Sequence, residues 1–127
     1  MDKYIIKKII IIAKSNLGLI KCIENNYINE IIYLIENGTD IHVDNDYVIK
    51  WASKNGHLEV VKLLIENEAN IHADDEYAIR WASNNGHLEV VKLLIENGAD
   101  IHTNNECAIR MASENGHLEV VELLIKN

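Results

Sequence analysis

The sequence repeats itself with a period of 30 residues. Residues 41–70 and 71–100 are identical at 22 of 30 aligned positions, and residues 71–97 and 101–127 are identical at 19 of 27. Residues 11–40, shifted onto the next unit, match at only six positions. A repeat of this length cannot bury an apolar face alone, so the units must stack on one another. We therefore expect a single repeat domain over residues 1–127, with a diverged N-terminal cap repeat at 1–40 and regular repeats at 41–70, 71–100 and 101–127.

Each regular repeat contains two short helical patterns separated by an Asn-Gly turn. In residues 76–83, apolar and small side chains recur at the spacing of one helix face, and the same spacing returns in residues 88–96. Neither helix exceeds about three turns, a length that is marginally stable in isolation. Neighbouring units must therefore supply the stability, which predicts an all-α solenoid of helix-turn-helix units.

Residues that favour helix ends stand between these patterns. Gly98 follows the second helix where a left-handed cap is expected, and Glu68 occupies the equivalent position one repeat earlier, which predicts local strain. Asp and Asn residues precede the first helices at 44–46, 74–75 and 104–105. Because these residue types are preferred at helix N-caps, we expect them to cap the first helices.

The segment from Asn85 to Asp100, with the sequence NGHLEVVKLLIENGAD, closely resembles the second half of an ankyrin repeat. The resemblance is strong over residues 41–127 and weak over 17–40. It implies an ankyrin-type solenoid that binds a partner protein through the concave face, where the first helices of such proteins lie.

Two departures from the family pattern concern the loops. The unit has 30 residues rather than 33, and residues 77–80, Tyr-Ala-Ile-Arg, replace the family's Thr-Pro-Leu-His. The missing residues fall where an ankyrin β-hairpin is expected, so we predict shortened loops in place of full β-hairpins. Units of this length with the motif Trp-Ala-Ser-x-Asn-Gly-His are similar to ankyrin proteins abundant in giant DNA viruses of the mimivirus type.

Composition excludes several classes of partner. Twelve Lys and Arg against 20 Asp and Glu give a net charge of -8, which repels phosphate backbones and disfavours nucleic-acid binding. No stretch approaches the roughly 20 apolar residues that span a bilayer, so we expect no membrane association. Cys22 and Cys107 show none of the short spacings of a disulfide-stapled secreted domain. We expect a reduced, intracellular protein, in the cytoplasm of a host cell.

The sequence does not favour a metal, a cofactor or catalysis. Equivalent histidines on stacked helices would lie about 8 to 10 Å apart, whereas zinc ligand atoms lie about 2 Å from the ion. We interpret the six histidines as structural, and expect three of them to bond exposed backbone groups at the start of the second helices: His57, His87 and His117. Ser53, Ser83 and Ser113 recur beside alanine, which indicates packing rather than a nucleophile. No unique catalytic constellation and no phosphate-binding loop occurs, so we expect neither an enzyme nor a cofactor.

Differences between the near-identical repeats indicate where a ligand binds, because the stacking core must repeat and a binding surface need not. They cluster in the loop and on one face of the first helix. We predict that the partner-binding residues are Tyr47, Lys50, Trp51, Lys54, Tyr77, Arg80, Trp81, Asn84, Arg110 and Met111. Two pairs of alternatives remain open. The aromatic rings are binding hot spots or fill space between units. The basic column of Lys50, Arg80 and Arg110 binds acidic groups of a partner or balances the acids in the loops.

The partner is expected to be a host or viral protein. A structural solenoid that assembles end to end, without a dedicated partner, is the alternative function. Val121, Leu124 and Ile125 keep their apolar character in the last unit, whereas solenoids normally end in a polar face. We therefore predict self-association through this edge, or that the chain is part of a longer array. At the other end, residues 1–21 carry a charge of +4, and Ile5, Ile9 and Ile12 favour a short cap helix over contact with an anionic surface.

Overall fold

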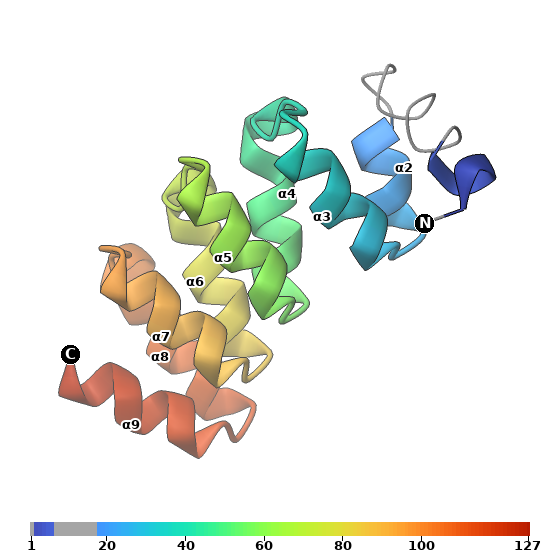
Figure 1. The fold of residues 1–127 in the computed structure, drawn as a ribbon. Helices are drawn as coiled ribbons and strands as arrows, with labels where there is room; N and C mark the ends of the chain where they lie inside the picture. The colour runs from blue at the N-terminus through green and yellow to red at the C-terminus, as the bar shows by residue number, and fades with distance from the viewer. Residues whose placement is uncertain (1, 7–17) are drawn as a thin grey trace. The chain divides into compact units, whose positions relative to one another are not determined.

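The computed structural model of the chain describes residues 2–6 and 18–127, and these residues form helices joined by turns and short loops, with no strand among them (Figure 1). The chain divides into two compact units, residues 1–41 and 42–127. In the first unit, α2 (Gly18–Glu24) is followed by α3 (Ile28–Glu36), and their buried side chains are Leu19, Cys22, Ile23, Ile31, Leu34 and Ile35. Burial, assisted by Glu30, raises the pKa of the Cys22 thiol. Residues 3–6 are helical, and Ile9 and Ile12 of the predicted cap helix lie outside the described residues.

The second unit consists of three helix pairs. They are α4 (Val43–Lys54) with α5 (Leu58–Glu66), α6 (Ala73–Asn84) with α7 (Leu88–Glu96), and α8 (Thr103–Glu114) with α9 (Leu118–Lys126). The first helices stack in the order α4, α6, α8, and the second helices stack beside them as α5, α7, α9 (Figure 1). The prediction of an all-α helical repeat solenoid without full hairpins is confirmed. No helix of the described part of the chain is long and apolar enough to cross a membrane.

Small side chains let the first helices approach one another closely. Ala52, Ala82 and Ala112 have no exposed surface, and Ser53 and Ser83 beside them are equally buried. The second helices contribute fully buried β-branched and leucine side chains, for example Val61, Val91 and Leu94. The apolar stripes and the packing role expected for Ser53 and Ser83 are therefore confirmed, whereas Ser113, in the third pair, is exposed.

The start of each first helix differs from prediction. Residues 44–46, 74–76 and 104–106 all have positive φ, between 50° and 63°, so each triplet forms a left-handed turn before the right-handed helix. The residues at the N-cap positions are His42, His72 and His102, and their side chains make no capping hydrogen bond. The expectation that the Asp and Asn residues cap these helices was therefore wrong. Seven of these nine residues are Asp or Asn, which are preferred at helix N-caps and also tolerate left-handed backbone better than most residues. Glu76 and Glu106 are the two exceptions.

Arginines from the following helix hold two of these left-handed turns. The Nε and Nη2 groups of Arg80 donate to the carbonyl oxygens of Asp75 and Asp74 at 2.8 and 2.9 Å. Arg110 holds the carbonyls of Asn105 and Asn104 in the same way, at 2.9 and 3.1 Å. These bonds satisfy carbonyl groups that the left-handed turn directs away from the helix that follows.

The turn between the helices of a pair also binds the preceding pair. The Nε2 group of His87 donates to the carbonyl oxygen of Lys54 at 3.0 Å, and the side chain of Asn85 donates to the same oxygen at 2.8 Å. The prediction that these histidines bond exposed backbone groups is thus confirmed for His87. The group that it bonds belongs to the C-terminal end of α4 rather than to its own pair.

The end of the second helix follows the sequence expectation. Gly98 has a φ of +92°, as predicted for a left-handed cap. Glu68, at the equivalent position after α5, has a φ of +66°. A side chain other than glycine, Asn or Asp in this conformation is strained, so the predicted strain at Glu68 has its structural basis.

Candidate binding surface

A pocket of about 310 Å³ lies on the exposed side of the first helices, which we call the first-helix face. It is lined by Tyr47, Lys50, Trp51, Lys54, Asn55 and Tyr77. Five of these six residues were predicted to bind a partner. Asn55 was not, because an Asn occupies this position in every regular repeat and comparison of the repeats does not distinguish it.

The tryptophans of this face are half-buried. The rings of Tyr77 and Trp81 lie 5.8 Å apart between centroids, as expected for residues four apart on a helix. Trp51 contacts His57 instead, at 4.8 Å between ring centroids. Burial, followed by repulsion from His87, lowers the pKa of His57. The neutral form of this ring therefore packs against Trp51 at pH 7.

Two lysines of α4 lie over aromatic rings of α6. The Nζ atom of Lys54 is 4.6 Å from the centroid of Trp81, and the Nζ atom of Lys50 is 5.8 Å from that of Tyr77. Cation–π contacts of this kind join neighbouring helix pairs. The rings of Tyr77 and Trp81 therefore take part in packing between repeats, and Tyr77 also lines the pocket.

Lys50 forms an ion pair with Asp74 of the next repeat. Its side chain is only 11% exposed, and its ammonium group bonds the carboxylate of Asp74 from the next repeat. Asp74 also accepts a hydrogen bond of 2.7 Å from Asn45. The bond from Lys50 is the main reason that the pKa of Asp74 lies below its ordinary value. Sequence reasoning missed Asp74 and Asn45, because a local pattern does not show a contact between loops of different repeats.

The remaining predicted residues have separate surroundings. Arg80 and Arg110 bond the left-handed turns described above, and the guanidinium carbon of Arg80 lies 6.0 Å from the centroid of Tyr77. Asn84 donates to Asn85 at 3.0 Å. The sulfur of Met111 accepts a hydrogen bond from the thiol of Cys107 at 3.1 Å. The structure thus brings the four predicted residues of α4 together with Tyr77 of α6 at one pocket. The other predicted residues of α6, and those of α8, do not line it.

The histidines that directly precede the first helices pair with acids. His72 bonds Glu76, and His102 bonds Glu106 at 2.7 Å, each through its Nδ1 atom. His42 contacts Asp46 at 3.1 Å, and Asp46 in turn accepts a hydrogen bond from the backbone amide of Asn70 at 2.6 Å. Within residues 2–6 and 18–127, His, Cys, Asp and Glu side chains do not gather into a group of three that could hold a metal ion.

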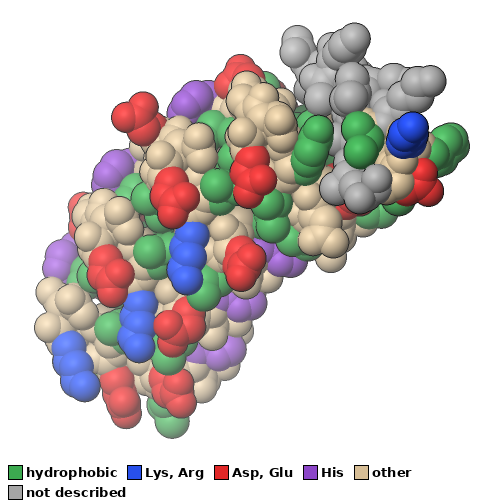
Figure 2. All heavy atoms as spheres, viewed as in Figure 1, with side chains coloured by type: hydrophobic (Ala, Val, Ile, Leu, Met, Phe, Trp, Pro, Cys, Tyr) green, Lys and Arg blue, Asp and Glu red, His purple; other side chains and the backbone are tan. Residues whose placement is uncertain are grey.

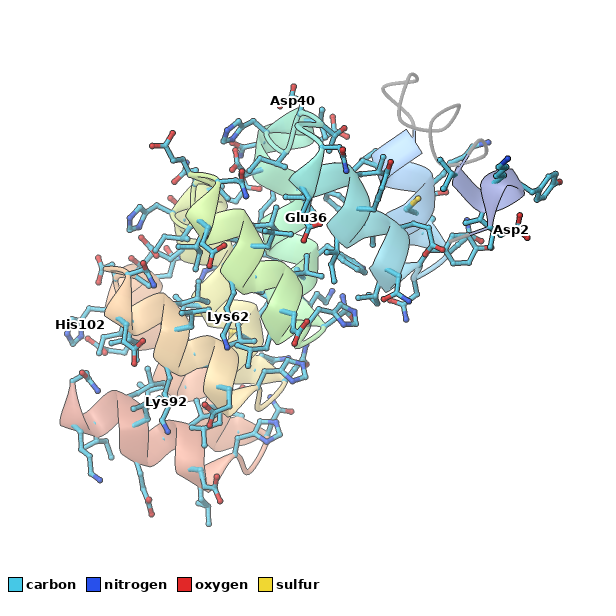
Figure 3. The ribbon with its side chains drawn as sticks, viewed as in Figure 1. Asp2, Glu36, Asp40, Lys62, Lys92 and His102 are labelled. Atoms are coloured by element: carbon cyan, nitrogen blue, oxygen red, sulfur yellow. The ribbon has the colours of Figure 1, made fainter. Side chains whose placement is uncertain are left out.

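The second helices present a different surface. Figure 2 shows acidic and basic side chains mixed over the face of α5, α7 and α9, with histidines along both of its edges. Lys62 and Lys92, labelled in Figure 3, belong to this face, and Lys92 lies 3.7 Å from Glu89. A mixed charged surface of this kind is typical of a solvated helix face.

A comparison with protein families agrees with the repeat architecture. The family model for ankyrin repeats (3 copies) matches residues 3–75, 19–105 and 49–127, so its overlapping matches extend over nearly the whole chain. The chain belongs to the ankyrin repeat family.

Proposed function

We propose that the first-helix face binds a partner protein. Ankyrin repeats generally act as protein–protein interaction modules and generally lack enzymatic activity. One observation supports this face: all residues that line its pocket except Asn55 stand at positions that differ among the three repeats, whereas the second helices hardly vary. The stacking core does not require the variation, so selection for a ligand is the simpler explanation.

The chemistry of the face suits a protein ligand. Half-buried Tyr and Trp rings offer large contact areas that are already held by their neighbours, and such residues are enriched in binding hot spots. Tyr47 keeps 39% of its surface exposed at the edge of the pocket. With a net charge of -8, the chain favours a protein over a nucleic acid. Given the resemblance to giant-virus ankyrin proteins, we propose a host or viral protein, met in the cytoplasm of the host cell.

Affinity capture followed by a direct binding measurement tests this proposal. A protein captured from host lysate is purified, and its dissociation constant is measured against the wild type, Trp51→Ala and Tyr77→Ala. Lys62→Ala on the second-helix face is the matched control. We expect a loss of about 2 kcal/mol of binding free energy in the two pocket variants and none in the control. A partner that binds all four proteins equally would exclude the first-helix face.

A second candidate function is assembly through the edge formed by α8 and α9. Leu118 and Ile125 are 73% and 69% exposed. Gly116 has no heavy atom within 4 Å of a Cβ built on it, whereas a histidine from the next repeat packs on Gly56 and on Gly86. This edge therefore has the chemistry of the surfaces that are covered between repeats.

Light scattering over a range of concentrations tests the assembly function. The mean mass of the wild type should rise with concentration, and Leu118→Glu should remain monomeric because a charge at the contact opposes burial. Glu119→Gln, on the same helix, is the control and should behave as the wild type. A strictly monomeric wild type at high concentration would exclude self-assembly.

A further inference from the structure

The position occupied by Lys54 distinguishes the three regular repeats by charge. It is Lys54 in the first, Asn84 in the second and Glu114 in the third. The three residues recur at one position of successive first helices, so they form a column, which we call the charge column. Its sign changes from positive at α4 to negative at α8.

Lys54 contributes the available positive charge at the pocket. Among the described residues it makes no ion pair, and its ammonium group contacts only the electron-rich face of Trp81. The other basic group at the pocket, that of Lys50, is already bonded to Asp74. The hydroxyl groups of Tyr47 and Tyr77 make no hydrogen bond to any described residue and are additional donors at the same place.

The other two members of the column differ in what they offer. Asn84 donates to Asn85 and accepts a hydrogen bond from Asn115 at 2.9 Å, so its amide is already used within the fold. Glu114 is exposed and forms no ion pair with any residue that the structure describes. A ligand lying along the first-helix face therefore meets a positive group at α4 and a negative group at α8.

We infer that the pocket between α4 and α6 binds an acidic side chain, Asp or Glu, of a partner polypeptide segment, and that the charge column orients this segment with a basic side chain toward Glu114. The inference rests on the proposed function and adds to it the chemistry and the direction of the ligand. A single carboxylate matches the single uncommitted ammonium group, and the rings of Trp51 and Tyr77 suit an apolar neighbour of that carboxylate. A doubly charged phosphate fits less well, because Asp74 lies beside the pocket.

Helix spacing sets the separation of the two charges on the ligand. Packed helices lie about 8 to 10 Å apart, so Lys54 and Glu114, two helices apart, are about 16 to 20 Å from one another. An extended chain covers about 3.3 Å per residue. The acidic and basic side chains of the ligand are therefore expected to lie about five or six residues apart in sequence.

Selection from a displayed library of random linear peptides tests the inference on the whole chain. We expect the enriched peptides to share an Asp or Glu beside an apolar residue, followed or preceded at a fixed distance by Lys or Arg. Lys54→Asn, which introduces the residue of the next repeat, should weaken their binding by about tenfold, because a charge-assisted contact is lost. Lys54→Arg should keep most of the affinity, and Lys62→Asn on α5 should have no effect.

The double variant Lys54→Glu/Glu114→Lys tests the direction. When this variant is the binding target of the same library, the enriched peptides should carry the acidic and basic residues in the reverse order. Circular dichroism melts of every variant establish that the fold is intact.

The possible failures are distinguishable. Peptides that lose binding with Trp51→Ala but bind Lys54→Asn as they bind the wild type would overturn this inference and leave the proposed function in place. The same holds for enriched peptides without an acidic residue, and for an order of charges unaffected by the double variant. Peptides that bind independently of Trp51, or the absence of any enriched peptide, would count against both.

Discussion

His87 packs on Gly56 of the preceding repeat, so closely that a Cβ atom at residue 56 would lie 2.5 Å from its Nδ1 atom. The same imidazole reaches past the turn to the carbonyl of Lys54. His117 repeats the packing on Gly86. The Asn-Gly-His motif therefore makes contacts between repeats, because the histidine of one turn packs on the glycine of the preceding turn.

Replacing this glycine should destabilise the stack. Gly56→Ala introduces a Cβ both at a φ of +73° and against the ring of His87. We expect a loss of about 2 to 4 kcal/mol in the free energy of unfolding, from left-handed strain and overpacking together. Urea denaturation measures it.

Gly116→Ala is the matched control. Its φ is +75°, and nothing lies within 4 Å of the new Cβ atom. Only the left-handed backbone strain remains in this variant, so the free energy of unfolding should fall by about 1 to 2 kcal/mol. Equal losses in the two variants would show that the contact with His87 has no energetic effect.

Relieving the strain at Glu68 should stabilise the protein. Glu68 has a φ of +66°, so Glu68→Gly removes the left-handed strain of a side chain with a Cβ atom. We expect a gain of about 1 kcal/mol, seen as a higher melting temperature. Glu68→Ala, which keeps the Cβ atom and removes the charge, should show no comparable gain. An unchanged melting temperature in Glu68→Gly would show that the positive φ of Glu68 does not destabilise the fold.

The half-buried position of Trp81 predicts effects on both stability and binding. Trp81→Ala removes contacts with Tyr77 and with Lys54. We expect a loss of about 1 to 3 kcal/mol in stability, below the 3 to 5 kcal/mol of a fully buried tryptophan. Affinity for a captured partner should fall in the same variant. A lowered melting temperature with unchanged affinity would remove Trp81 from the binding surface.

The bond between Lys50 and Asp74 predicts a pH-dependent contribution to stability. The pKa of Asp74 is lowered in the folded state, first by the hydrogen bond from Lys50, so the unfolded chain binds its proton more readily. The stabilisation is present above the unfolded pKa, about 4, and is lost as pH falls through the lower folded pKa.

Asp74→Asn should therefore have a lower urea midpoint than the wild type at pH 7, with the difference declining below about pH 4. Asp75→Asn, the neighbouring acid in the same turn, is the control. A difference for Asp74→Asn that persists unchanged to the lowest pH at which the wild type folds would exclude the ion pair as its cause.

The alignment of the repeats shows the charge column, but it does not show the bonding partners of the basic residues near it. Lys50 and Arg80 are equivalent in sequence, yet Lys50 bonds Asp74 of the next repeat and Arg80 bonds backbone carbonyls of its own. The difference depends on the length and shape of each side chain and on which loop lies within reach. Comparison of the repeats therefore predicts a binding surface, but it does not show which charged groups on that surface are already paired with other residues.

The sequence by itself determined the repeat, because its near-identical units align directly with one another. It also determined the two helical stripes and the left-handed glycine at residue 98, because apolar spacing and the absence of a Cβ atom act over a few neighbouring residues. The tertiary structure decided the left-handed turns at 44–46, 74–76 and 104–106 and the partner of His87. Asp and Asn are preferred at helix N-caps and also adopt positive φ more readily than most residues, so their presence does not decide between the two conformations. Contacts between elements that are distant in sequence, such as Asn70 on Asp46, select one of these conformations.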